Sequence, residues 1–150
     1  MNVADLPGLY FLDTNVFVYS FDDSAPEKQK TARQLIQDAL ESQRGIISTQ
    51  VVQEFLNVAQ RKFSTPLKGT DAHLYLSSVL LPLCQHFPSI HFYDYALLLQ
   101  AEVGFSLYDT LIVAAALEAG CKTLYSEDLQ NGRIIRGMTI LNPFASSRTG

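Results

Sequence analysis

Residues 9–15 read Leu-Tyr-Phe-Leu-Asp-Thr-Asn, four apolar residues followed directly by three polar ones. A short, continuous apolar run of this kind predicts a strand that is buried on both faces. Asp13 then stands immediately after the carboxyl end of that strand. In open sheets covered by helices, ligands bind outside the carboxyl ends of the strands, so Asp13 lies where a site is expected.

Short apolar runs alternate with helical patterns along the rest of the chain. Further strands are predicted at 45–48, 90–92, 123–125 and 139–141. Helices are predicted at about 25–43, after Thr49, at 71–81, at 94–103 and between Ser106 and Gly120. Ser24, with Glu27 three residues later, and Thr49 are candidate helix caps. This alternation predicts an α/β fold with a parallel sheet that helices cover on both faces.

The composition limits what the chain can be. Its 150 residues are 47% hydrophobic and 17% charged, which predicts one domain over 1–150 with a core at about 9–144 and a frayed tail. No apolar run approaches the roughly 18–20 residues that span a bilayer, and no signal peptide opens the chain, so we expect a cytoplasmic protein without membrane contact. The net charge of −4 disfavours non-specific nucleic-acid binding by bulk positive charge.

Four acids are placed to meet at one edge of the predicted sheet. Asp13 and Asp128 follow predicted strands, Glu54 lies in the second turn of the helix after another strand, and Asp109 lies in the first turn of the apolar helix. Several carboxylates in one partly buried pocket repel one another and remain ionised only beside a cation. Oxygen ligands of this kind suit Mg²⁺ or Mn²⁺, and a hydrated divalent metal hydrolyses phosphodiesters.

Each acid also has a simpler interpretation when it is taken alone. Asp13 and Asp109 could act only in helix capping, Glu54 could be a solvated helix residue, and Asp128 a turn residue. Their joint placement at strand ends is what favours a metal site.

These same segments resemble the motifs of the PIN domain family. The resemblance covers Asp13-Thr14-Asn15 after the first strand, residues 48–55 with Glu54, residues 106–116 with Asp109, and residues 124–129 with Asp128. The length and the ending Asn142-Pro143-Phe144 look most like VapC-type toxins of toxin–antitoxin pairs. One such motif would be weak evidence, but four in the same order make the resemblance specific. The resemblance extends over residues 9–144, approximately.

The resemblance implies a PIN-like three-layer fold around a mostly parallel five-stranded sheet. It implies a Mg²⁺- or Mn²⁺-dependent endoribonuclease that hydrolyses RNA, forms a homodimer and is blocked by a cognate antitoxin. Asp13 and Asp109 would hold the metal, with Glu54 and Asp128 binding directly or through water. Thr14, Asn15, Ser106 and Glu127 would support them, and Glu127 could share the role of Asp128.

Other residues and functions were weighed against this one. Arg61, Lys62, Arg133 and Arg136 could touch RNA phosphates or be solvated surface charges. Tyr10, Tyr93, Tyr95 and Tyr108 could stack bases, although packing in the core or an interface is the favoured interpretation. A phosphatase of the haloacid dehalogenase type would need an acid where Asn15 stands. A housekeeping RNA-processing nuclease and a non-catalytic PIN-like binding module remain alternatives.

Overall fold

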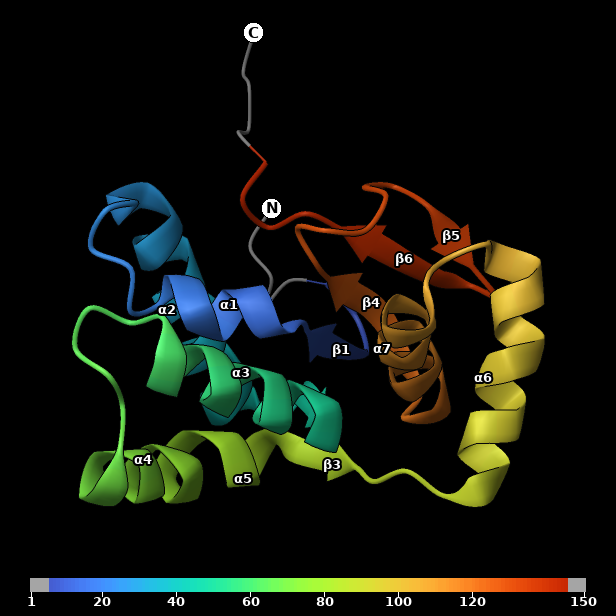
Figure 1. Ribbon diagram of the computed structural model, residues 1–150. Helices are drawn as coiled ribbons and strands as arrows, with labels where there is room; N and C mark the ends of the chain where they lie inside the picture. The colour runs from blue at the N-terminus through green and yellow to red at the C-terminus, as the bar shows by residue number, and fades with distance from the viewer. Residues whose placement is uncertain (1–5, 146–150) are drawn as a thin grey trace, which may run out of the picture.

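The first strand of the chain lies at the centre of the sheet. In the computed structural model, which describes residues 6–145, six strands pair in the order β3-β2-β1-β4-β6-β5 (Figure 1). Their bounds are β1 Leu9–Leu12, β2 Gly45–Ser48, β3 Cys84–His86, β4 Cys121–Tyr125, β5 Ile134–Ile135 and β6 Met138–Leu141. All neighbours run parallel except β5, which runs antiparallel to β6. The predicted sheet of five parallel strands is confirmed, with the short β5 added at its edge.

Helices cover this sheet. They are α1 Thr14–Tyr19, α2 Pro26–Ser42, α3 Thr49–Arg61, α4 Gly69–Tyr75, the π-helical turn η2 Leu76–Leu80, α5 Leu81–Leu83, α6 Ile90–Val103 and α7 Leu107–Glu118. In the view of Figure 1, α1 and α2 lie to the left of the strands, α7 lies below β6, and α6 stands at the right edge.

The central strands are buried on both faces, which explains their unbroken apolar sequence. Neighbouring residues of a strand point to opposite faces, and Phe11 and Leu12 of β1 are both fully buried. Helix α7, apolar on every side, packs against β2, β3 and β4, with seven of its residues in the core. It ends before Gly120, whose φ of +84° is the left-handed conformation that glycine adopts without strain.

The structure corrects the prediction around residue 90. Residues 90–92 were predicted as a strand, but they form the first turn of α6, because Ser89 caps that turn by accepting a 3.1 Å hydrogen bond from the Phe92 backbone N–H. The strand is β3 instead. It escaped prediction because Cys84-Gln85-His86 is not an apolar run, although Cys84 and His86 are both buried.

Two predicted helix caps are also wrong. Helix α2 begins after Ala25 without a side-chain cap, and the Ser24 hydroxyl donates to Asp22 Oδ1 at 2.6 Å instead. Helix α3 is capped by Ser48 rather than Thr49, with the Val51 backbone N–H donating to the Ser48 hydroxyl. The helix predicted at 71–81 is divided into α4, η2 and α5.

Within residues 6–145, no single helix is long and apolar enough to cross a membrane. Helices α6 and α7 reach that length and apolarity only as a pair, and the chain bends by 112° between them. Residues 146–150, in the tail that was expected to be frayed, lie outside the described part of the chain.

Candidate active site

Asp13 joins the two central strands at their carboxyl ends. Its backbone N–H donates to the Tyr125 carbonyl at the end of β4, at 3.0 Å. Its side chain caps α1, with Oδ1 accepting from the Thr14 backbone N–H, while Oδ2 accepts from the Ser126 hydroxyl, both at 2.7 Å. Asp13 is 9% exposed and Ser126 is fully buried, so this carboxyl group is held in a fixed position away from bulk water.

Burial makes the ionised form of Asp13 costly. It raises the pKa of Asp13 to about 6, against the hydrogen bonds from Ser126 and Thr14, which lower it. The negative charges of Glu54 and Asp128 raise this pKa further. Glu54 and Asp128 therefore both lie close enough to Asp13 to affect its ionisation.

Glu54 is held against α1 by two hydrogen bonds. The Thr14 hydroxyl donates to Glu54 Oε1 at 2.6 Å, and Gln50, one turn earlier on α3, donates from Nε2 to Oε2 at 3.1 Å. The same Gln50 amide also donates to the Tyr108 carbonyl in α7, at 3.1 Å. Gln50 thus connects the glutamate to the helix that carries the fourth acid.

Asp128 is held by Asn15, the residue two places after Asp13. Asn15 donates from Nδ2 to Asp128 Oδ2 at 2.7 Å, across 113 positions of the chain. Of the predicted supports, Thr14 thus contacts both Asp13 and Glu54, and Asn15 contacts Asp128.

Asp109 lies nearby but is bound differently. It is exposed in the first turn of α7, and its backbone N–H donates to the Ser106 hydroxyl at 3.3 Å, so Ser106 caps the helix. Among the described residues, no hydrogen bond joins the Asp109 carboxylate to another of the four acids. Its connection to them runs through Tyr108 and Gln50.

The Glu127 side chain is hydrogen-bonded to Tyr19 and Lys28 and, within residues 6–145, to none of the four acids, although Glu127 is next to Asp128 in the sequence. The Tyr19 hydroxyl donates to Oε1 of Glu127 at 2.7 Å, and Lys28 Nζ lies 2.6 Å from Oε2. Burial alone would raise the pKa of Glu127, but these hydrogen bonds hold it below its ordinary value. The two glutamate oxygens are therefore engaged by α1 and α2.

The four basic residues predicted at the rim have different surroundings. Arg61 and Lys62 are exposed at the end of α3. The Arg133 guanidinium lies 4.8 Å from the centre of the Phe105 ring, whereas Arg136 forms a 2.9 Å ion pair with Glu102. Arg136 precedes β6, at the end of that strand remote from Asp13.

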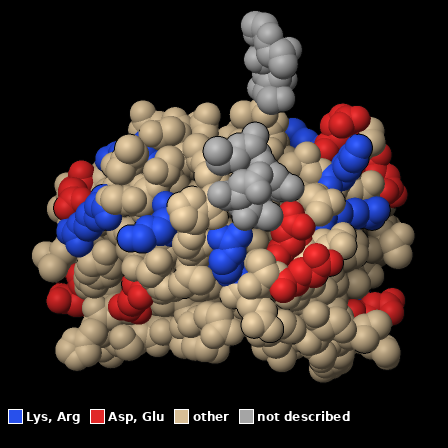
Figure 2. All heavy atoms as spheres, turned by 180° about the vertical axis from the view of Figure 1, so that it is seen from behind, with Lys and Arg blue, Asp and Glu red and all other residues tan. Residues whose placement is uncertain are grey.

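Surface charge does not form a broad basic field on the face seen in Figure 2. Lysine and arginine side chains are scattered there among acidic and uncharged residues. This distribution agrees with the expectation that something other than bulk charge must handle any phosphate.

The carboxylates fit a hard cation that keeps much of its own water. Within residues 6–145, no group of three or more His, Cys, Asp or Glu residues is arranged to hold one ion. Mg²⁺, however, is commonly bound through one or two carboxylates and retains several waters. A nearby cation would favour the charged form of this buried carboxyl, whose pKa is raised to about 6 by burial and by two further carboxylates.

Sequence reasoning missed four of the residues that position these acids: Ser126, Gln50, Tyr19 and Lys28. For Ser126 a signal existed, because it is a polar residue directly after a predicted strand, as Asp13 is. The other three lie on helices. Their contacts with the acids depend on how α1, α2, α3 and α7 pack, which the sequence pattern does not show.

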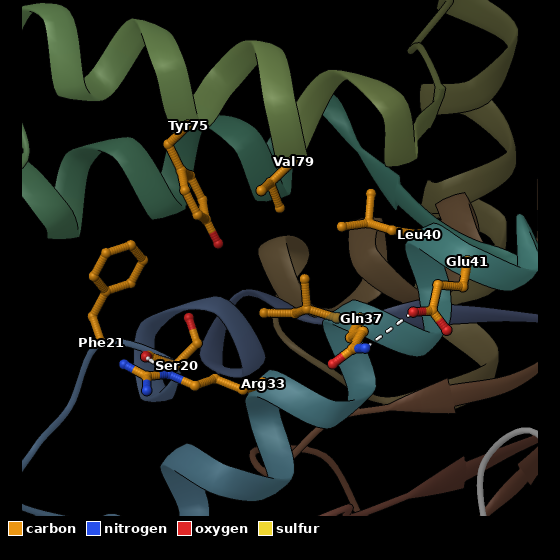
Figure 3. Close-up of a pocket in the computed structure, with 9 residues that line it drawn as sticks. Ser20, Phe21, Arg33, Gln37, Leu40, Glu41, Tyr75 and Val79 are labelled. Carbon is orange, nitrogen blue, oxygen red and sulfur yellow. Dashed lines mark hydrogen bonds between the residues drawn. The ribbon is translucent and has the colours of Figure 1, made fainter.

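A separate apolar cavity of about 460 Å³ lies between α2 and the segment α4–η2. Figure 3 shows Tyr75 and Val79 pointing from that segment toward α2, with Phe21 at one side. None of the four acids lines this cavity, so it is distinct from the acidic site.

Comparisons with known proteins agree with this geometry. The structure is similar to a toxin–antitoxin complex from Klebsiella pneumoniae (TM-score 0.63, 19% identity, 90% of this chain and 98% of that one). It is also similar to FitAcB from Neisseria gonorrhoeae, with a TM-score of 0.57 and 19% identity over 91% of this chain and 99% of that one. A third similar structure is VapC20 from Mycobacterium tuberculosis, a toxin described as cleaving the sarcin–ricin loop, with a TM-score of 0.53 and 16% identity over 79% of this chain and 89% of that one.

At these identities the structural neighbours show the fold. No curated protein matches the chain in a sequence search. The PIN domain model matches residues 10–134, a span that runs from β1 through the segment after β4 and contains all four acids. The chain therefore belongs to the PIN domain family.

Proposed function

We propose that this chain is a Mg²⁺- or Mn²⁺-dependent endoribonuclease and the toxin of a toxin–antitoxin pair. The observation that carries the nuclease proposal is the buried Asp13 carboxyl, which Glu54 and Asp128 face and whose pKa is raised to about 6. Asp13 and Asp109 would hold the cation, and Glu54 and Asp128 would bind it directly or through water. When bound, the cation supplies activation of water and neutralises charge on the phosphate oxygens.

The chain's own residues hold the acids in place for this role. Ser126 and the Thr14 backbone fix both oxygens of Asp13, the Thr14 hydroxyl fixes Glu54, and Asn15 fixes Asp128. Hydrolysis forms a bond from a water oxygen to phosphorus and breaks the bond to the leaving ribose oxygen, which takes up a proton. This requires no side-chain nucleophile.

The test is metal-dependent cleavage of RNA by the purified protein. We expect cleavage of cellular RNA with Mg²⁺ or Mn²⁺ and none with a chelator. Asp13→Asn keeps the side-chain volume and should abolish cleavage, whereas Asp71→Asn, which changes an exposed acid on α4, should cleave like the wild type. Full cleavage by folded Asp13→Asn protein would overturn the assignment, and metal-independent RNA binding without cleavage would favour a binding module.

The toxin half of the proposal draws support from the cavity in Figure 3. Its lining is mostly apolar and open to solvent, which suits apolar side chains of an antitoxin segment. Expression of the chain should arrest growth, and co-expression of the product of a neighbouring small open reading frame should relieve the arrest. Val79→Glu should weaken that relief while RNA cleavage persists. Growth unaffected by an active nuclease would favour the housekeeping alternative.

A further inference from the structure

A second small cavity adjoins the acids on the far side of Gln50. It has a volume of about 150 Å³ and lies between the first turns of α3, the first turns of α7 and the segment after β3. Gln50 belongs to both places, because its amide contacts Glu54 while its side chain lines the cavity. A group seated in this cavity is therefore next to the acidic site.

Aromatic side chains dominate one side of the cavity. Tyr93 is 45% exposed and Tyr108 is 67% exposed, so both present ring surface to solvent at the cavity. Phe92 is buried and packs against Tyr93 (ring centres 5.4 Å apart) and against His86 (4.6 Å). The Tyr93 ring thus rests on a fixed base, and both tyrosines offer exposed surface on which a flat ring can stack.

The opposite side of the cavity is formed by side-chain amides. Gln50 and Gln53 lie three positions apart on α3, and both line the cavity. The Gln50 amide nitrogen already donates to Glu54 and to the Tyr108 carbonyl, which leaves its oxygen as an acceptor, whereas the Gln53 amide carries both donors and an acceptor. Among residues 6–145, no Lys, Arg, Asp or Glu lines the cavity, and its His86 is engaged by Glu118 at 2.7 Å. Stacking surfaces with amides, and without cations or carboxylates, suit a neutral planar ring rather than a phosphate or a metal ion.

The size of the cavity restricts the ligand further. Its volume is well below the roughly 300–1,000 Å³ of pockets for drug-sized ligands, so it admits a single ring system. We propose that this cavity binds one unpaired nucleobase of the RNA, beside the bond that is cut, and thereby sets base preference at that position. The inference rests on the proposed ribonuclease function for the identity of the ligand.

Binding without cleavage tests the inference. Single-stranded RNA octamers, each with one abasic position, would be titrated by fluorescence anisotropy against wild-type protein in EDTA. One abasic position should weaken binding about fivefold or more, the lower end of the loss of one base stack. Tyr108→Ala should lose a similar factor on intact RNA and no longer sense that position. Tyr108→Trp should restore both.

Leu97→Ala is the matched control, because Leu97 is 58% exposed on α6 and does not line the cavity. It should bind like the wild type, and Gln53→Leu should change which base is preferred at the sensed position. A flat abasic scan, or a Tyr108→Ala protein that still senses the position, overturns the inference. So does a Tyr108→Ala protein in which only the oligomeric state changes.

The same experiment separates this inference from the nuclease proposal. RNA cleavage with a flat abasic scan leaves the nuclease standing and removes the base site. If one abasic position weakens binding but the protein never cuts RNA with Mg²⁺ or Mn²⁺, the base site stands and the nuclease proposal is removed.

Discussion

Ser126 donates its hydroxyl to Oδ2 of Asp13 at 2.7 Å, and this hydrogen bond joins the ends of the two central strands. Because it lowers the pKa of Asp13, Ser126→Ala should raise that pKa further above 6. Mn²⁺ binding, which needs the ionised carboxylate, should then begin at a pH about one unit higher, since a hydrogen bond to a charged group is worth about 1.5–3 kcal/mol. Calorimetric titration of Mn²⁺ between pH 5 and about 8 measures the shift.

Ser20→Ala is the matched control for this variant. Ser20 is also buried, but its hydroxyl donates to the Phe17 carbonyl rather than to an acid. It should lose stability without any change in the pH dependence of Mn²⁺ binding. Equal pH profiles for both serine variants would show that Ser126 does not tune Asp13.

Asp13 should make the metal-free protein less stable as the pH rises. Folding raises the pKa of Asp13 from 3.8 to about 6, so the folded chain holds this proton more tightly than the unfolded chain. The contribution of Asp13 to stability is therefore full below about pH 4, is lost as the pH rises through about 6, and amounts to about 3 kcal/mol. In Asp13→Asn this slope should disappear, and the variant should be the more stable protein at pH 8. Urea unfolding in EDTA at several pH values measures the free energy of unfolding of both proteins. If this free energy changes with pH in the same way in the wild type and in Asp13→Asn, the prediction is contradicted.

Lys28 should matter for activity more than for stability. It is bound to Glu127, the neighbour of Asp128, but solvent screens a partly exposed ion pair, so the pair contributes little to stability. Lys28→Met should therefore leave the urea midpoint of unfolding nearly unchanged. Displacement of the segment that carries Asp128 should slow RNA cleavage about tenfold or more. Lys30→Met, an exposed lysine on the same helix, is the control, and equal cleavage rates for the two variants would remove the positioning role.

Asp109→Asn distinguishes a metal ligand from a residue that matters only for the helix end. Asp109 is exposed, and its backbone N–H, which the variant retains, makes the hydrogen bond to Ser106. Stability should change by less than about 0.5 kcal/mol, while metal-dependent cleavage should fall about 100-fold or more. Ser106→Ala reports the cost of losing the cap itself, about 1 kcal/mol in chemical unfolding. Wild-type cleavage by Asp109→Asn would leave Asp109 with no role in the reaction.

The parts of the fold that sequence reasoning predicted are those governed by local pattern. The apolar run before Asp13, the all-apolar α7 and the cap at Ser106 each have one dominant physical cause within a few residues. Their positions at strand ends were enough to bring Asp13, Glu54 and Asp128 together.

Where several causes compete, local pattern failed. Ile90 and Phe92 favour a strand by residue type, yet the cap at Ser89 and the burial of Phe92 against His86 produce a helix. The roles of Gln50 and Lys28 depend on contacts between segments far apart in the chain. No pattern within either segment reports such contacts.

The position of β1 between β2 and β4 has a consequence during protein synthesis. Asp13 is made early, but Ser126 and Asp128 follow β4, and β4 itself pairs with β6, which ends at Leu141. A chain that stops before β4 therefore contains Asp13, Glu54 and Asp109 but lacks both Ser126 and Asp128. The hydrogen bonds that hold Asp13 Oδ2 and Asp128 can therefore form only after the ribosome has passed residue 128.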